Sequence, residues 1–130
     1  MTALSSRQII VFGIPNCDTV KKSRTWLQEQ GHDFLFHDFK KQGLTSSVIE
    51  QWLQYVPLET LINRKGTTWR ALTDEQKASA SDRTNAIALI LAQPSIVKRP
   101  VLQIEKNGGV QHVSVGFSAD QFQTIFGTLT

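Results

Sequence analysis

The sequence predicts an α/β fold in which a mixed four-stranded sheet carries an inserted helical block. Three observations lead to this prediction: a strand, a helix and a second strand fit within the first forty residues, residues 58–93 show helical patterns only, and two β-rich runs followed by a helix close the chain. With 130 residues, the chain has the size of one ordinary domain. We therefore expect a single domain over residues 1–130, with the helical insertion at about 58–93.

Residues 8–27 have the pattern of a short apolar strand, a loop and the start of a helix. Gly13 and Pro15 mark the loop, and the helix is expected to begin at or just after Cys17 and to run from Asp18 to about residue 30. The phenylalanine-rich run at residues 34–40 predicts a second strand that is largely covered on both faces. A strand, a crossing helix and a strand predict a parallel pair with a right-handed crossover.

Cap residues predict the helices that follow. Thr45 can cap a helix over residues 46–55, whose apolar positions fall on one side. Within the inserted block, Thr73 and Gln76 have the spacing of a capping box, and Ser81 can cap an apolar helix after it. We expect two or three short helices in this block and no strand.

The last third of the chain returns to strands. Residues 101–104 and 110–115 are β-rich and flank the segment EKNGG, which predicts an antiparallel hairpin because Asn and Gly tolerate positive φ. Ser118 can cap a final helix over residues 119–126. The complete order, βαβ, helix, helical block, ββα, is that of a thioredoxin-like fold with helices inserted before its hairpin.

Composition makes several classes of protein unexpected. With 14 Lys plus Arg against 11 Asp plus Glu, the net charge of +3 is mild, and the cations are spread along the chain, unlike those of a typical nucleic-acid binder. The apolar run at residues 86–92 is far too short to cross a membrane, and the N-terminus lacks the features of a secretion signal. One cysteine cannot form an internal disulfide. We expect a soluble, cytoplasmic protein with neither a membrane nor a nucleic acid as a direct partner.

Cys17 carries the strongest functional signal. A thiol at the first turn of a helix faces unpaired backbone N–H groups and the positive end of the macrodipole, and both favour thiolate over thiol. The alternative is a small buried hydrophobic residue, a common role of a free cysteine. Val20 occupies the third position after Cys17, so there is no Cys-x-x-Cys pair. Turnover would therefore need an external thiol, from glutathione or a partner protein.

Two neighbours on the same helix are further candidates. Lys21 lies four residues after Cys17 and can project along the same face, where it could stabilise a thiolate or bind an anionic substrate. It could equally extend into solvent, as we expect of Lys22. Thr19 could donate a hydroxyl hydrogen bond to a thiolate, or serve only as a helix-start residue. No metal site is expected, because the three histidines lack ligand spacing with one another and with the cysteine.

Four motifs in order resemble one family. They are NCDTVKKSRTWL after the first strand, FHDFKKQGL on the second, LINRKGTTWR early in the helical block and IVKRPVL opening the hairpin. Together they resemble the arsenate reductase (ArsC) family, in particular its Spx-like, YffB-type branch, over nearly the whole chain. The wider family includes glutathione- and glutaredoxin-linked arsenate reductases and redox-sensing regulators of RNA polymerase, whereas the YffB-like branch resembles a group of thiol reductases.

The resemblance also implies where anion-binding residues lie. In thioredoxin-like folds the proline that opens the hairpin strand is commonly cis and lies against the active-site loop, so Arg99 and Pro100 are expected near Cys17. A guanidinium there could bind an oxyanion or carboxylate with two hydrogen bonds; the alternative is a solvent-exposed arginine at a strand end. The position of a second active-site arginine of the arsenate reductases falls on Asn63, with Arg64 one residue later.

Two departures from the arsenate reductases argue against efficient arsenate reduction. Residues 113–118, VSVGFS, contain no arginine where those enzymes place a third one, and Gly13 stands where they carry a histidine before the cysteine. The leading function is therefore a glutathione-dependent thiol oxidoreductase. In it Cys17 forms a mixed disulfide with glutathione or a glutathionylated substrate, and Arg99 and Arg64 bind carboxylates.

Two alternatives remain open, and neither needs a bound cofactor. The first is arsenate reduction by the same cysteine, with Arg99 binding the oxyanion and with glutathione and glutaredoxin resolving the adduct. The second is an Spx-like regulator that binds RNA polymerase. The relatives of that kind use a Cys-x-x-Cys switch, and its absence here counts against a self-contained disulfide switch.

Overall fold

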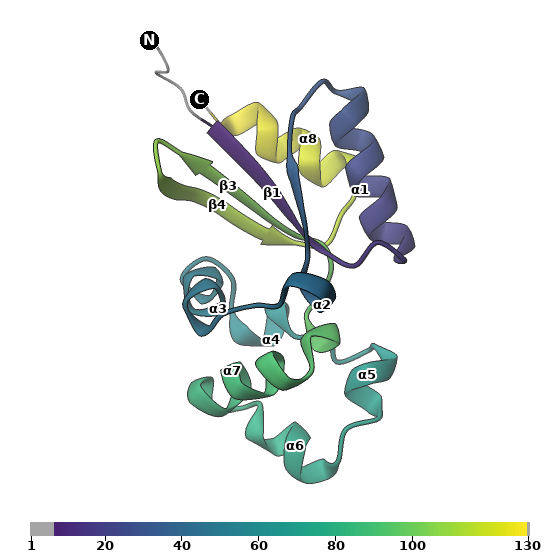
Figure 1. Ribbon diagram of the computed structural model, residues 1–130, viewed down its shortest axis with the longest axis vertical. Helices are drawn as coiled ribbons and strands as arrows, with labels where there is room; N and C mark the ends of the chain where they lie inside the picture. Colours follow the sequence, from purple (N-terminus) through teal and green to yellow (C-terminus); the bar gives the residue numbers. More distant parts are fainter. Residues whose placement is uncertain (1–6, 130) are drawn as a thin grey trace. The chain divides into compact units, whose positions relative to one another are not determined.

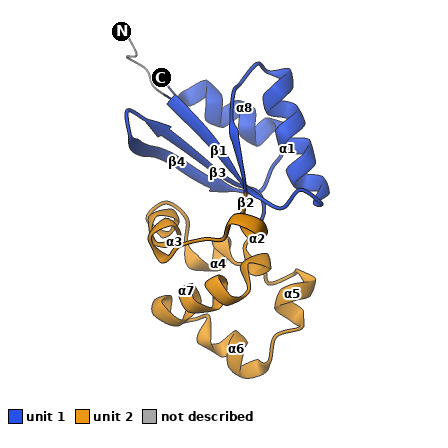
Figure 2. Ribbon diagram, viewed as in Figure 1, with its two compact units in different colours: residues 1–37, 99–130 blue, residues 38–98 orange. Residues whose placement is uncertain are grey.

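The computed structural model describes residues 7–129, which divide into two compact units (Figure 2). The first, which we call the sheet unit, consists of residues 7–37 and 99–129 and is blue in Figure 2. The second, which we call the helical unit, is Asp38–Lys98 and is orange. Whether residues 1–130 act as the single domain expected from the sequence stays a prediction. Every helix in the described part of the chain is too short or too polar to cross a membrane.

The sheet has four strands in the order β2-β1-β3-β4. Their bounds are β1 (Arg7–Gly13), β2 (Leu35–Asp38), β3 (Val101–Lys106) and β4 (Gly109–Val115). β3 is antiparallel to both β1 and β4, whereas β1 and β2 run in the same direction (Figure 1). The mixed thioredoxin-like sheet, with helices inserted before its hairpin, is thereby confirmed.

The hairpin between β3 and β4 forms as predicted and is slightly longer than expected. Its two turn residues, Asn107 and Gly108, have φ angles of 55° and 85°. Positive φ at both positions is what a two-residue type I′ turn requires, and Asn-Gly is the pair that adopts it most readily. A register shift follows Ile104, so the alternation of β4 is irregular near the turn.

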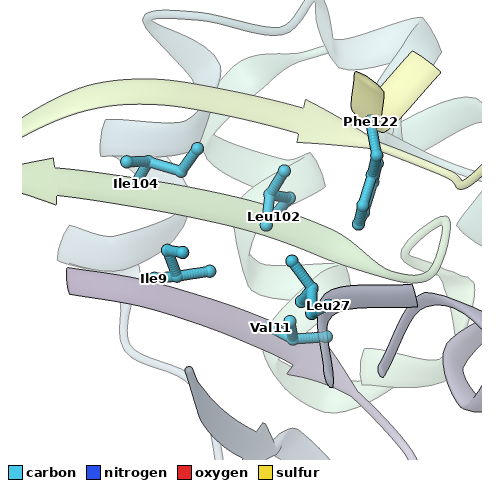
Figure 3. Close-up of a cluster of buried hydrophobic side chains, with 6 residues drawn as sticks. All are labelled: Ile9, Val11, Leu27, Leu102, Ile104 and Phe122. Atoms are coloured by element: carbon cyan, nitrogen blue, oxygen red, sulfur yellow. The ribbon is translucent and has the colours of Figure 1, made fainter. Parts of the chain in front are cut away.

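The core of the sheet unit lies between the sheet and its two helices. These are α1 (Asp18–Glu29), which contributes Leu27, and α8 (Ala119–Thr128), which contributes Phe122. The register pairs Ile9 with Ile104 and Val11 with Leu102, so these side chains share one face of the sheet. Figure 3 shows how the six side chains lie together: Ile9, Val11, Leu27, Leu102, Ile104 and Phe122.

The prediction for the second strand is wrong in two respects. β2 ends at Asp38, because the Asp38 carboxylate accepts hydrogen bonds from Lys40 N and Lys41 N and so begins α2 (Phe39–Gln42). The strand is also not covered on both faces, since it is an edge strand and Leu35 is 54% exposed. Phe39, counted with the strand, instead lies buried in the helical unit.

The helical unit confirms two predicted caps and corrects a third. Thr45 caps α3 (Ser46–Leu53), and Thr73 with Gln76 forms the capping box of α6 (Asp74–Ser79). Asp82, not Ser81, caps α7 (Arg83–Ala92), because its carboxylate accepts from Asn85 N while the Ser81 hydroxyl donates to Ala78 O. Residues 58–93 hold four α-helices, not two or three. In order, the remaining elements are α3 (Ser46–Leu53), α4 (Leu58–Leu61), α5 (Thr67–Arg70), α6 (Asp74–Ser79), α7 (Arg83–Ala92) and the 3-10 helix η1 (Pro94–Ile96).

Candidate functional site

Cys17 is the N-cap residue of α1, as the sequence predicts. Its backbone is extended, with φ −142° and ψ 121°, and its carbonyl oxygen accepts the first helical hydrogen bond from Lys21 N at 2.9 Å. The Cys17 side chain makes no capping hydrogen bond, and the residue is half-buried. Because the first N–H groups of a helix have no partner within it, those of α1 can still donate to a negative charge placed at this cysteine.

Gly13 fixes the path of the loop between β1 and α1. It is buried, and a Cβ atom at this position would lie 2.8 Å from Cγ2 of Val20, the fully buried residue of the first turn of α1. The absence of a side chain therefore allows β1 to approach the helix closely. For the same reason, the histidine that the resemblance associates with this loop does not fit at Gly13 unless α1 moves.

Arg99 and Pro100 lead into β3 at the end of the sheet where β1 leads into the Cys17 loop. The last pair between β1 and β3 joins Phe12 to Val101, so β3 begins beside the end of β1 (Figure 1). Pro100 directly precedes β3. The Arg99–Pro100 peptide bond is cis, as expected, and Pro100 O accepts from Gly116 N at 2.8 Å. Pro100 is buried, and Arg99 is half-buried with its Nε enclosed.

The other predicted residues of α1 extend the positive charge along the helix. Thr19 is half-buried, and Lys21 and Lys22 are both exposed. Lys21 and Lys22 line a hollow of about 310 Å³ whose walls include the aromatic rings of Trp26 and Phe117. Among residues 7–129, neither lysine has an ion-pair partner. The cations that follow Cys17 are therefore available to an anionic ligand.

Asn63 and Arg64 belong to the helical unit. The backbone of Asn63 donates to Ile96 O at 2.7 Å, and its side-chain Oδ1 accepts from Lys65 N at 3.1 Å. Asn63 therefore builds a turn, a role that the sequence analysis did not foresee. Arg64 is exposed, with its guanidinium carbon 5.4 Å from the centre of the Trp69 ring. The predicted substrate-binding roles of both residues stay predictions.

His112 is a half-buried residue with an enclosed ring nitrogen, and sequence reasoning missed it. It lies opposite Ile104 on the core face of β4, and its Nε2 is enclosed without a hydrogen-bond partner among the described residues. Burial lowers the pKa of His112 from its usual value of 6.5. The hairpin pattern alone could not reveal this, because regular pairing from the turn would place Gln111 opposite Ile104, and the register shift after Ile104 brings His112 there instead.

The chain matches known proteins over most of its length. Residues 12–125 match the model of the ArsC family. The solved structure of a YffB protein is 42% identical, covers 90% of this chain and 97% of its own, and has a TM-score of 0.79. An ArsC-related protein from Brucella melitensis is 44% identical, with coverages of 94% and 96% and a TM-score of 0.67. The global transcriptional regulator Spx of Lactiplantibacillus plantarum is 25% identical over 118 residues, which are 88% of this chain and 83% of that protein. These matches confirm the resemblance that the four motifs indicated.

Proposed function

The chain belongs to the ArsC family, and we propose that within it the protein is a thiol oxidoreductase whose single nucleophile is Cys17 and whose co-substrate is glutathione. The observation that carries this proposal is the structural environment of Cys17. It is a half-buried N-cap residue whose side chain makes no capping hydrogen bond, and Lys21 follows one turn later. An N-terminal helix position and a nearby cation are the features that activate thiols in proteins.

In the first step, the Cys17 thiolate attacks one sulfur of a glutathionylated substrate. A disulfide forms between Cys17 and glutathione, the original disulfide breaks, and the substrate sulfur leaves as a thiolate that takes a proton from water. The first-turn N–H groups of α1 stabilise the attacking thiolate beforehand. The substrate thus leaves as a free thiol.

In the second step, an external thiol must release Cys17. The chain has one cysteine, so no second thiol of the same molecule can attack the mixed disulfide. The thiolate of a second glutathione attacks the glutathione sulfur, oxidised glutathione leaves, and Cys17 returns as a thiolate. The net reaction turns one glutathionylated substrate and one glutathione into a free substrate thiol and oxidised glutathione. Glutaredoxin is a protein partner that could supply the same thiol.

In this proposal, positively charged side chains near Cys17 bind the carboxylates of glutathione. Lys21 lies four residues after Cys17, and Arg99 lies at the end of the sheet where β1 leads into the Cys17 loop. An arginine can bind a carboxylate through two parallel hydrogen bonds, whereas a lysine acts as a point charge. We assign the carboxylate contacts first to Arg99 and second to Lys21, with Thr19 as a hydroxyl donor and Pro100 as the residue that shapes the backbone there. Arg64 and Asn63 of the helical unit remain candidates for a further contact.

The test is intact-protein mass spectrometry after exposure to oxidised glutathione at neutral pH. We expect a single adduct on Cys17 that forms faster in the native protein than in urea-unfolded protein, and that reduced glutathione removes. The unfolded chain is a matched control, because it presents the same thiol without the helix start. Cys17→Ser should form no adduct. An adduct that forms no faster in the folded protein would contradict the proposal.

The Spx relatives suggest a second candidate, a regulator that binds RNA polymerase without a disulfide switch. The observation that favours it is the match to regulators of that name over 88% of this chain. Recovery of RNA polymerase subunits in equal amounts by the native protein and by Cys17→Ser would support it. Arsenate reduction, the other alternative, is tested by turnover with glutathione and glutaredoxin. We expect little turnover, because Gly13 leaves no imidazole beside the cysteine.

A further inference from the structure

The helical unit contains a hollow of about 320 Å³ whose lining is rich in cations. Arg64, Lys65 and Lys98 line it, together with one carboxylate, that of Glu59. Its volume lies at the lower end of the range found for small-molecule sites, about 300 to 1,000 Å³. The hollow is formed entirely by residues of the helical unit and includes neither Cys17 nor Arg99.

Backbone pairing brings Lys98 to this place from a distant part of the sequence. Ile62 and Val97 form an antiparallel bridge, and the hydrogen bonds on either side are Lys98 N to Leu61 O at 2.8 Å and Asn63 N to Ile96 O at 2.7 Å. The segment that carries Lys98 is thereby fixed against the segment that leads into the turn of Arg64 and Lys65. The three cations converge through main-chain structure and not through flexible side chains alone.

The turn that carries the other two cations is also held at several points. Asn63 Oδ1 accepts from Lys65 N at 3.1 Å, and Lys65 O accepts from Arg70 Nη2 at 2.9 Å. Gly66 packs so closely that a Cβ atom there would lie 3.0 Å from Asn63 Nδ2. A backbone that is fixed before binding loses little conformational entropy when a ligand arrives.

The charges around the hollow are unbalanced. In the part of the chain that the structure describes, Arg64, Lys65 and Lys98 have no ion-pair partner, and neither has Glu59. The guanidinium carbon of Arg64 lies 5.4 Å from the centre of the Trp69 ring, a cation–π contact that leaves its charge without a balancing anion among the described residues. Gathering like charges costs free energy even near a surface, and an anion in the hollow would remove that cost.

From these observations we infer that the helical unit binds a phosphoryl group in this hollow. A phosphate offers several oxygens in different directions, which suits one planar guanidinium and two lysine point charges better than a single planar carboxylate does. The hydroxyl of Thr60, which also lines the hollow, can donate a further hydrogen bond. The ligand is either inorganic phosphate or a small phosphate monoester. This inference does not depend on the proposed chemistry of Cys17.

Nuclear magnetic resonance of the full chain tests the site. Inorganic phosphate or glycerol phosphate is added at constant ionic strength, set with chloride, and the backbone amide signals are followed. We expect saturable shifts at residues 63–66 and at Lys98. Lys65→Ala and Lys98→Ala should each weaken binding by about fivefold, a usual effect for one partly exposed charge contact. These side chains are exposed, so the variants should fold.

Two further variants make the result specific. Lys41→Ala removes an exposed cation of the helical unit away from the hollow and should leave the dissociation constant unchanged. Glu59→Gln removes the only carboxylate of the lining and should tighten phosphate binding by about twofold to threefold.

The outcomes separate the two ligand sources and the two proposals. Tighter binding of glycerol phosphate identifies a phosphate monoester as the ligand, and tighter binding of inorganic phosphate identifies the free ion. Shifts that do not saturate, or that are equal in Lys65→Ala, Lys98→Ala and Lys41→Ala, would overturn the inference. Cys17→Ser should bind phosphate as the native chain does, so failure of the thiol chemistry leaves this result intact.

Discussion

The sheet unit and the helical unit position their candidate site residues in different ways. In the sheet unit, β1 pairs with β3 over six residues, and this long pairing brings the Cys17 loop and Arg99 to one end of the sheet. In the helical unit, a single bridge and a tight turn bring three cations around one hollow. The position of Cys17 therefore depends on the packing of a core, whereas the cation cluster depends on local backbone hydrogen bonds. Substitutions in the two units test that difference.

Removing the central aromatic ring of the sheet unit should have the largest effect. Phe122 is fully buried in the cluster with Leu27 and Leu102, so Phe122→Ala should lower the free energy of unfolding by about 3 to 5 kcal/mol. Urea unfolding measures this change. Phe126→Ala, on the same helix but only half-buried, is the matched control and should cost clearly less. Equal losses would mean that Phe122 is not the centre of this core.

The close approach of β1 to α1 gives the second prediction. Gly13→Ala places a Cβ atom 2.8 Å from Val20 Cγ2, and such overpacking usually costs about 1 to 3 kcal/mol. The Gly13→Ala variant should therefore unfold at lower urea concentration than the native protein, and its reaction with oxidised glutathione should be slower because the helix start moves.

A double-mutant cycle with Val20→Ala isolates the contact. Val20→Ala removes the clashing methyl groups, so Gly13→Ala should cost less in that background than in the native chain. An identical cost in both backgrounds would show that the steric explanation of Gly13 is wrong.

Sequence reasoning succeeded where the signal was local. Cys17 as the start of α1, the Asn-Gly turn and the capping box of Thr73 are each set by residues a few positions apart, and the structure confirms all three. It failed where adjacent residues compete for one role. Asp82 displaced Ser81 as a cap, and Asp38 ended β2 early by starting a helix.

In the candidate sites, too, the features set by nearby residues were predicted and those set by distant residues were not. Cys17 and the cis bond before Pro100 followed from motifs, but the hollow of the helical unit did not. It requires the bridge between Ile62 and Val97, which are far apart in sequence and show no strand pattern. Asn63 was predicted as a ligand-binding residue from its alignment alone, which could not reveal its hydrogen bond to the backbone of the turn.

The third prediction compares a cation from each unit. If carboxylate binding at the Cys17 end of the sheet depends on Arg99, then Arg99→Ala should slow adduct formation with oxidised glutathione by about tenfold, or about 1.4 kcal/mol. Arg99→Lys should recover only part of the rate, because lysine cannot make two parallel hydrogen bonds. Reactions quenched at successive times and analysed by mass spectrometry give the rates.

Arg64→Ala is the corresponding change in the helical unit. A loss smaller than that of Arg99→Ala would assign the main carboxylate contact to the sheet unit. A larger loss would reverse that assignment and place the Arg64 contact first.

The smallest predicted effect is the pH dependence caused by His112. Burial on the core face of β4 lowers the pKa of His112 below 6.5, so the folded protein takes up this proton less readily than the unfolded chain. The stability that depends on neutral His112 is therefore complete above pH 6.5 and is lost as the pH falls through the lower pKa of the folded state. Urea unfolding between pH 7 and pH 5 should show a decline that is weaker in His112→Gln, whose side chain does not titrate. His32→Gln, which keeps His112, should retain the full decline. Equal declines in the native protein and His112→Gln would show that protonation of this histidine does not limit stability.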